Sequence, residues 1–350
     1  MMLVYLDEST LTEYLAPGFR DNSFCCISLT EESWHPTSDT TNVDYWLNWR
    51  AVVSAIWVLS SIVIASILIW KYEGSHHHQE EEEIGSQGRR VGTLYDDESW
   101  RPCLNGIHPA WLLAFRVASF SILLALLIVD IRMEGTANLY YYTDWTLMLV
   151  TIYFALGSLL SIYGCRQISS KKVSSDEIEF RSTDVHPSND SESHQNIAQK
   201  IAGFWGYLFQ IIYQINAGAV VLTDCVFWFI ILPFLAIKDY DLSFVLFAVH
   251  SANAILFLGD TALNSLRFPW FRIAYFLIWT AIYVIFQWLI HAIVALRWPY
   301  PFLDLSSPRA PFWYLGVTLL HFPCYAMFPL IMRLKGFLFT RWFQSYHSME

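Results

Sequence analysis

The sequence predicts an all-α membrane protein, a polytopic helix bundle with about seven transmembrane helices. Three observations support this fold class. Of the 350 residues, 55% are hydrophobic and only 15% are charged, whereas soluble domains carry about 25% charged residues. Several apolar stretches are long enough to cross a bilayer. The 16 Trp and 19 Tyr residues have side chains that favour the interface between lipid and water.

The expected spans follow from length, since about 20 apolar residues are needed to cross about 30 Å of hydrocarbon. The candidate spans are residues 50–70, 110–130, 144–164, 217–237, 242–258, 272–295 and 312–332. The fifth begins close behind the fourth, so we expect these two to form a tight helical hairpin. Residues 203–216 are also apolar, and together with the fourth span they exceed one crossing. We therefore expect an interfacial or tilted helix there, followed by the span.

Lys and Arg residues indicate the orientation, because they concentrate in cytosolic loops. Most of them flank two long polar loops, 71–101 and 165–200, and the C-terminal part of the chain. This pattern predicts a lumenal or extracellular tail over 1–45, a helix bundle over 46–335 and a cytosolic tail over 336–350. The loops are rich in Ser and Glu, so we expect them to be cytosolic and disordered. Both an endomembrane and the plasma membrane fit this arrangement.

Charge and cysteine content argue against several functional classes. The net charge of −10 offers no basic surface for nucleic acid. The six Cys residues show no CxxC spacing, so neither a disulfide framework nor a zinc site is indicated. The three histidines at 76–78 adjoin four glutamates, and we interpret them as part of a solvated loop. We therefore expect no metal and no cofactor.

Ionisable side chains are costly inside a bilayer, so each needs a partner or a function. His250 lies near the middle of the fifth span, and Asn253 follows on the same helical face. Asp224, His291 and His321 lie in the fourth, sixth and seventh spans. One interpretation is that these groups form hydrogen bonds that fix the bundle. Two further carboxylates lie at span ends, where we expect them to meet water: Asp130 and Asp260.

The third span opens with a polar pair, Thr143 and Asp144. We expect Thr143 about one turn below the outer surface, and His250 enters the membrane from the same side. A hydroxyl beside an imidazole is the minimum nucleophile–base pair for attack on an ester. Asn253 or Asp144 would orient the ring or stabilise charge. The alternative is structural: Thr143 caps the helix, and Asp144 interacts with the helix dipole.

Four stretches resemble a family of plant multi-pass membrane proteins that is similar to the animal rolling-stone-like proteins. The stretches are WRPCLNGIHPAWLLAFR (100–116), YYYTDWTLMLVTIYFALGS (140–158), HSANAILFLGDTALN (250–264) and RWPYPFLDL (297–305). The resemblance covers about residues 44–332. It implies a multi-pass architecture, and it implies no particular activity because members of this family are mostly uncharacterised.

A more distant resemblance concerns activity. A Tyr-x-Thr order at the head of one span, followed by a lone His in a later span, looks like the androgen-induced, FAR-17a-type membrane proteins. Those proteins are threonine hydrolases that cleave fatty acid esters of hydroxy fatty acids. Carried over to this sequence, the resemblance implies that Thr143 is the nucleophile and His250 the base. This chain departs from that family by an additional first span and by its long polar loops.

Two functions remain open from the sequence. The first is an intramembrane hydrolase of fatty-acid esters that uses Thr143 and His250, supported by Asp144 and Asn253. Its partners would be membrane lipids, including a lipid-ester substrate. The second is a non-enzymatic membrane protein, such as a transporter, a lipid-binding protein or a signalling component. In that case His250, Asn253 and Asp224 would line a polar cavity.

Overall fold

The computed structural model describes residues 39–73, 94–104, 106–134, 140–182, 201–231 and 244–342. Within these ranges the chain is helical and contains no strand, which confirms the all-α prediction. Six of the described helices are long and apolar enough to cross a membrane. The protein is therefore a multi-pass membrane protein.

The helical elements differ in length and type. In chain order they are α2 (Val43–Trp46), α3 (Trp49–Tyr72), the 3₁₀ helix η2 (Asp96–Ser99), α4 (Pro109–Glu134), α5 (Tyr142–Ser182), α6 (Phe204–Val226), the π-helical turn η4 (Phe227–Ile231), α8 (Phe244–Leu263), the 3₁₀ helix η5 (Trp270–Arg272), α9 (Ile273–Ile293), the 3₁₀ helix η6 (Pro301–Leu303) and α10 (Ala310–Trp342).

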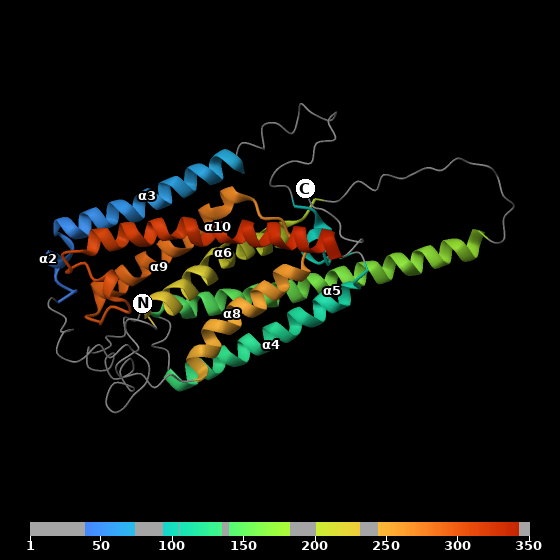
Figure 1. Ribbon diagram of the computed structural model, residues 1–350, viewed down its shortest axis with the longest axis horizontal. Helices are drawn as coiled ribbons and strands as arrows, with labels where there is room; N and C mark the ends of the chain where they lie inside the picture. The colour runs from blue at the N-terminus through green and yellow to red at the C-terminus, as the bar shows by residue number, and fades with distance from the viewer. Residues whose placement is uncertain are drawn as a thin grey trace, which may run out of the picture.

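The long helices lie side by side and alternate in direction (Figure 1). α3, α5, α8 and α10 start at the end of the bundle where α2 lies, and α4, α6 and α9 start at the opposite end. We call these the α2 end and the opposite end. α3, α9 and α10 pack together on one side of α6, and α4, α5 and α8 pack together on the other. This arrangement makes α6 the central helix.

Burial follows this arrangement. Of the apolar part of α6, 61% is buried, against 22% for each of α3, α4 and α10, which present apolar side chains outward. The inward polar groups of α6 find partners on its neighbours, as a bilayer core without water requires. Gln214 donates from Nε2 to the Arg267 carbonyl at 3.1 Å and accepts from the Tyr325 hydroxyl at 2.7 Å. These bonds join α6 to α10 and to the connection between α8 and α9.

The fourth span differs from its prediction. α6 runs without a break from Phe204 to Val226, so residues 203–216 form the first half of the span and not a separate interfacial helix. The prediction took the span to end at residue 237, which made 203–237 too long for one crossing, whereas α6 ends at Val226. The fifth predicted span corresponds to α8, a shorter apolar helix. Residues 232–243, where that span was predicted to begin, lie outside the described residues.

The polar segments differ in part from their predictions. α5 continues past residue 164 to Ser182, into the segment predicted to be the second loop. At the end of the first predicted loop, Leu94 and Ser99 are buried against the bundle. The remaining parts of both loops, residues 1–38 and residues 343–350 lie outside the described residues.

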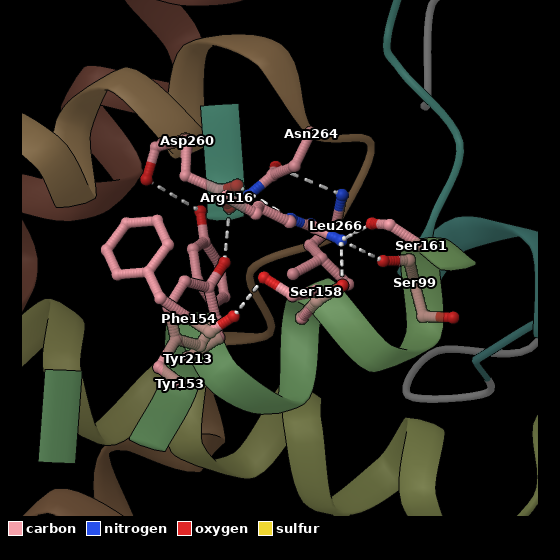
Figure 2. Close-up of polar contacts among 12 residues, drawn as sticks. Ser99, Arg116, Tyr153, Phe154, Ser158, Ser161, Tyr213, Asp260, Asn264 and Leu266 are labelled. Atoms are coloured by element: carbon pink, nitrogen blue, oxygen red, sulfur yellow. Dashed lines mark hydrogen bonds and ion pairs between the residues drawn. The ribbon is translucent and has the colours of Figure 1, made fainter. Parts of the chain in front are cut away.

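An ion pair in the interior joins α4 to α8. Arg116 Nε lies 2.8 Å from Asp260 Oδ1, and both side chains are fully buried. Arg116 Nη1 donates to the Ser99 carbonyl and to the Ser161 hydroxyl, each at 2.8 Å. Figure 2 shows Arg116 between the two serines and Asp260. One guanidinium therefore ties together α4, α5, α8 and the 3₁₀ helix η2.

The second oxygen of Asp260 is also satisfied. The Tyr153 hydroxyl donates to Asp260 Oδ2, and Asn264 Nδ2 donates to it at 2.9 Å. The expectation that Asp260 meets water at the span end was therefore wrong, because neighbouring helices enclose it completely. The same expectation was wrong for Asp130, which is 7% exposed. Position along a helix indicates depth in the membrane, but it does not indicate whether neighbours cover the side chain.

Replacing Asp260 by Ala is expected to lower the free energy of unfolding by about 3–5 kcal/mol, because it leaves the Arg116 guanidinium buried without its counter-charge. Equilibrium unfolding of the purified protein in detergent measures the change. Arg101→Ala is the matched control, since Arg101 pairs with Asp97 at 3.1 Å with its side chain 50% exposed. Exposed pairs contribute at most about 1 kcal/mol. Equal losses in the two variants would contradict the importance of the buried pair.

Candidate functional site

Thr143 and Asp144 lie in the first turn of α5. Because α5 begins at Tyr142, Thr143 is inside the helix and does not occupy the N-cap position. The Tyr142 backbone N–H donates to the Tyr300 hydroxyl at 3.1 Å, and the Thr143 side chain also hydrogen-bonds to Tyr300. Burial raises the pKa of Tyr300 to about 12, so this hydroxyl stays neutral. Asp144 is buried, in the first turn, where a carboxylate interacts favourably with the helix dipole.

His250 and Asn253 lie on α8 with different neighbours. The His250 ring stacks on Phe227 with 3.7 Å between ring centroids, and its Nδ1 lies 3.9 Å from Asp224 Oδ1. Both His250 and Asn253 are buried. The described hydrogen bonds and ring contacts lead from Thr143 to Tyr300 and from His250 to α6. They do not join Thr143 to His250, and the pairing inferred from the sequence stays a prediction.

A threonine and a histidine do meet elsewhere in the bundle. His321 Nε2 on α10 lies 2.8 Å from Thr280 Oγ1 on α9. Tyr142 Oη on α5 lies 2.9 Å from the same Thr280 oxygen. His321 is 2% exposed and Tyr142 is 8% exposed, so this polar group lies inside the bundle. Three helices thus bring together one imidazole and two hydroxyls.

The partners determine which atoms carry hydrogens. His321 Nδ1 lies 2.7 Å from the Val317 carbonyl, and a carbonyl only accepts, so Nδ1 carries the ring hydrogen. In the neutral ring Nε2 is then an acceptor, and the Thr280 hydroxyl donates to it. Since Thr280 has one hydroxyl hydrogen, Tyr142 must donate to Thr280. The result is a directed chain from Tyr142 through Thr280 to His321, which points the threonine hydrogen at a base.

A cavity opens beside this chain, between α3, α9, α10 and η6. The space that it encloses is small, about 40 Å³. Its polar lining consists of Ser61, Thr280, Tyr314, Thr318 and His321. The other walls are aliphatic and aromatic, so the lining beside Thr280 and His321 is mainly apolar.

The remaining membrane histidine has a structural environment. His291 Nδ1 lies 2.7 Å from the Gln287 carbonyl one turn earlier, and its ring stacks on Trp298 with 3.8 Å between centroids. The sequence pattern did not distinguish His321 from His291, and it did not single out Thr280 or Tyr142. A threonine inside an apolar helix carries no signal of its own. Among the described residues, no group of three or more His, Cys, Asp or Glu side chains is placed to hold a metal ion.

Comparison with known proteins adds nothing to this geometry. No protein-family model, no curated protein and no solved structure matches the chain. The resemblances described from the sequence therefore stay predictions. The functional argument rests on the contacts of Thr280 and His321 and on the cavity beside them.

Replacing Tyr300 by Phe is expected to lower the free energy of unfolding by about 1–3 kcal/mol, because the buried Tyr142 N–H loses its acceptor. Unfolding in detergent measures this loss. Tyr163→Phe is the control, since Tyr163 is 43% exposed and is expected to change stability by less than about 0.5 kcal/mol. If Tyr300→Phe behaved like the control, the first turn of α5 would not depend on Tyr300.

Proposed function

We propose that this protein is an intramembrane hydrolase of lipid esters, with Thr280 as nucleophile and His321 as base. The observation that supports it is the 2.8 Å contact between Thr280 Oγ1 and His321 Nε2 beside an apolar cavity. This distance lies within the hydrogen-bond reach that a nucleophile–base pair requires. The reaction class agrees with that expected from the sequence, and the residues differ.

Each step follows from the hydrogen assignments. Thr280 Oγ1 attacks the ester carbonyl carbon while its proton passes to His321 Nε2. His321 then gives this proton to the leaving alkoxide, which departs as an alcohol and leaves an acyl group on Thr280. Water attacks the acyl-threonine with His321 again as base, and the products are a carboxylic acid and free Thr280. The Val317 carbonyl holds Nδ1–H throughout and favours the charged ring between the two transfers.

Tyr142 has a second role in this mechanism. Its hydroxyl donates to Thr280 in the resting site. Once Thr280 Oγ1 is bonded to carbon, the Tyr142 hydroxyl is available to donate to the carbonyl oxygen that becomes negative. A fixed donor aimed at a developing oxyanion contributes about 2.7–4 kcal/mol in other hydrolases. In a site closed to bulk water the interaction is stronger than in solution.

A second candidate function is lipid binding without catalysis. The observation that favours it is that Tyr142, Thr280 and His321 already satisfy one another, as groups do when they only fix a bundle. The cavity would then hold an apolar ligand and release it unchanged. A bound lipid that copurifies with the protein and survives long incubation would support this function over hydrolysis.

Thr280→Val and His321→Gln are each expected to lower the rate of ester hydrolysis by at least about 100-fold, the usual contribution of a general base. The assay is release of fatty acid from a lipid ester by purified protein in lipid nanodiscs. Thr318→Val is the matched control, because Thr318 lines the same cavity without being part of the chain; it is expected to keep its activity.

Thr143→Val and His250→Gln test the pair predicted from the sequence in the same assay. If these two variants lost ester hydrolysis while Thr280→Val stayed active, Thr143 and His250 would be the catalytic pair in place of Thr280 and His321. A fluorophosphonate that labels the wild-type protein once, and not Thr280→Val, would identify the nucleophile by mass. Hydrolysis that is equal in all variants, or absent from the wild type, would overturn the proposal.

A further inference from the structure

We propose a binding site for one divalent transition-metal ion at the contact between α6 and α8, formed by Asp224, His250 and Asn253. This site is independent of the proposed hydrolase chemistry. It lies toward the α2 end of the bundle, because Asp224 is near the end of α6 and His250 is the seventh residue of α8.

The first observation is the distance between Asp224 and His250, whose side chains are of the types that bind metal ions. Asp224 Oδ1 and His250 Nδ1 are 3.9 Å apart, which is too long for a hydrogen bond. His250 is 5% exposed, and its Nδ1 has no hydrogen-bond partner among the described residues. A buried nitrogen without a partner loses its interaction with water and gains nothing in return. An atom between His250 and Asp224 would remove this cost.

The second observation is a buried oxygen without a hydrogen-bond partner within the described ranges, Asn253 Oδ1, on the same face of α8. Asn253 is 2% exposed. Asn253 follows His250 by three residues, which makes the two side chains neighbours on a helix surface. The amide oxygen and the carboxylate can only accept, and neutral His250 also accepts at Nδ1 when Nε2 carries the hydrogen. Asp224 Oδ1 and His250 Nδ1 are then two acceptors that lie close together without a donor between them, which favours a cation there, and the Asn253 oxygen is the third candidate ligand.

The backbone around this cluster is unusual. α6 ends at Val226, two residues after Asp224, and the π-helical turn η4 begins at the next residue. Such π-helical turns occur often at functional sites. Phe227 is the first residue of η4 and covers one face of the His250 ring, with 9° between the ring planes. The turn thus fixes the orientation of the imidazole. The Asp224 side chain is 20% exposed, so the cluster is not completely enclosed by the helices.

The ligand types and spacing select the class of ion. Calcium and magnesium prefer oxygen ligands alone, whereas imidazole suits zinc and related transition metals. At a tetrahedral angle, bonds of about 2.0–2.2 Å from the metal to nitrogen and oxygen place two ligand atoms about 3.4 Å apart, so one ion fits if the 3.9 Å gap closes by about 0.5 Å. Three protein ligands leave a fourth position for water.

The test is binding of Co²⁺ or Zn²⁺ alone to the chelator-treated full-length protein in detergent, by calorimetry and by the visible absorption of Co²⁺. The background protein carries Ser in place of the three histidines at 76–78, and its purification avoids a polyhistidine tag. We expect one ion per chain. Asp224→Asn and His250→Gln are each expected to weaken binding by more than about tenfold, since even groups behind a metal ligand cost 10–100-fold.

Two further variants make the result decisive. His291→Gln removes another buried membrane histidine and is expected to leave binding unchanged. Asn253→Asp replaces a neutral ligand oxygen by a carboxylate and is expected to tighten binding. Absence of a stoichiometric ion in the background protein would overturn the site. The site would also be overturned if Asp224→Asn and His250→Gln both folded and both bound the ion as tightly as the background protein.

Discussion

The bundle depends on one buried charge pair, Arg116 with Asp260. An uncompensated guanidinium cannot stay in a membrane interior at reasonable cost, so four separate segments must meet around it. Its Nη1 group requires the Ser99 carbonyl and the Ser161 hydroxyl, and these positions align η2 and α5 with α4. Asp260 requires Tyr153 and Asn264. Lipid packing alone would let these helices slide, whereas a buried ion pair with directional hydrogen bonds specifies one register.

That register determines what can meet at the α2 end. α5 is held by its Tyr153 contact about three turns into the helix, and its first turn then reaches Tyr300 and Thr280. α8 is held by Asp260, and its other half brings His250 to Asp224. The ionic layer and the two sites are therefore separated along the same helices. The ion pair and the two proposed sites lie at different depths, so substitutions at the proposed sites can be tested without removing Arg116 or Asp260.

The sequence predicts the helices better than it predicts their faces. A bilayer demands long apolar runs, so hydropathy located six of the spanning helices. It misplaced the start of α6 because the span was taken to extend to residue 237, which left residues 203–216 outside a single crossing, whereas α6 ends at Val226. Arg116, seven residues into an apolar helix, was a visible signal of an ion pair. The argument for Thr143 and His250 used depth, which does not specify the direction of a side chain. Thr280 and His321 meet only because α9 and α10 are rotated toward each other.

Tyr142 makes two separate hydrogen bonds, one through its backbone and one through its side chain. Its backbone N–H is held by Tyr300 in the connection between α9 and α10, and its hydroxyl is held by Thr280 inside the bundle. A single residue therefore couples the surface at the α2 end to the polar chain below it. A protein or ion that bound the connection and displaced Tyr300 would shift the start of α5 and withdraw the hydrogen from Thr280. The contacts of Tyr142 would thus connect events outside the membrane to the proposed site without any entry into the cavity.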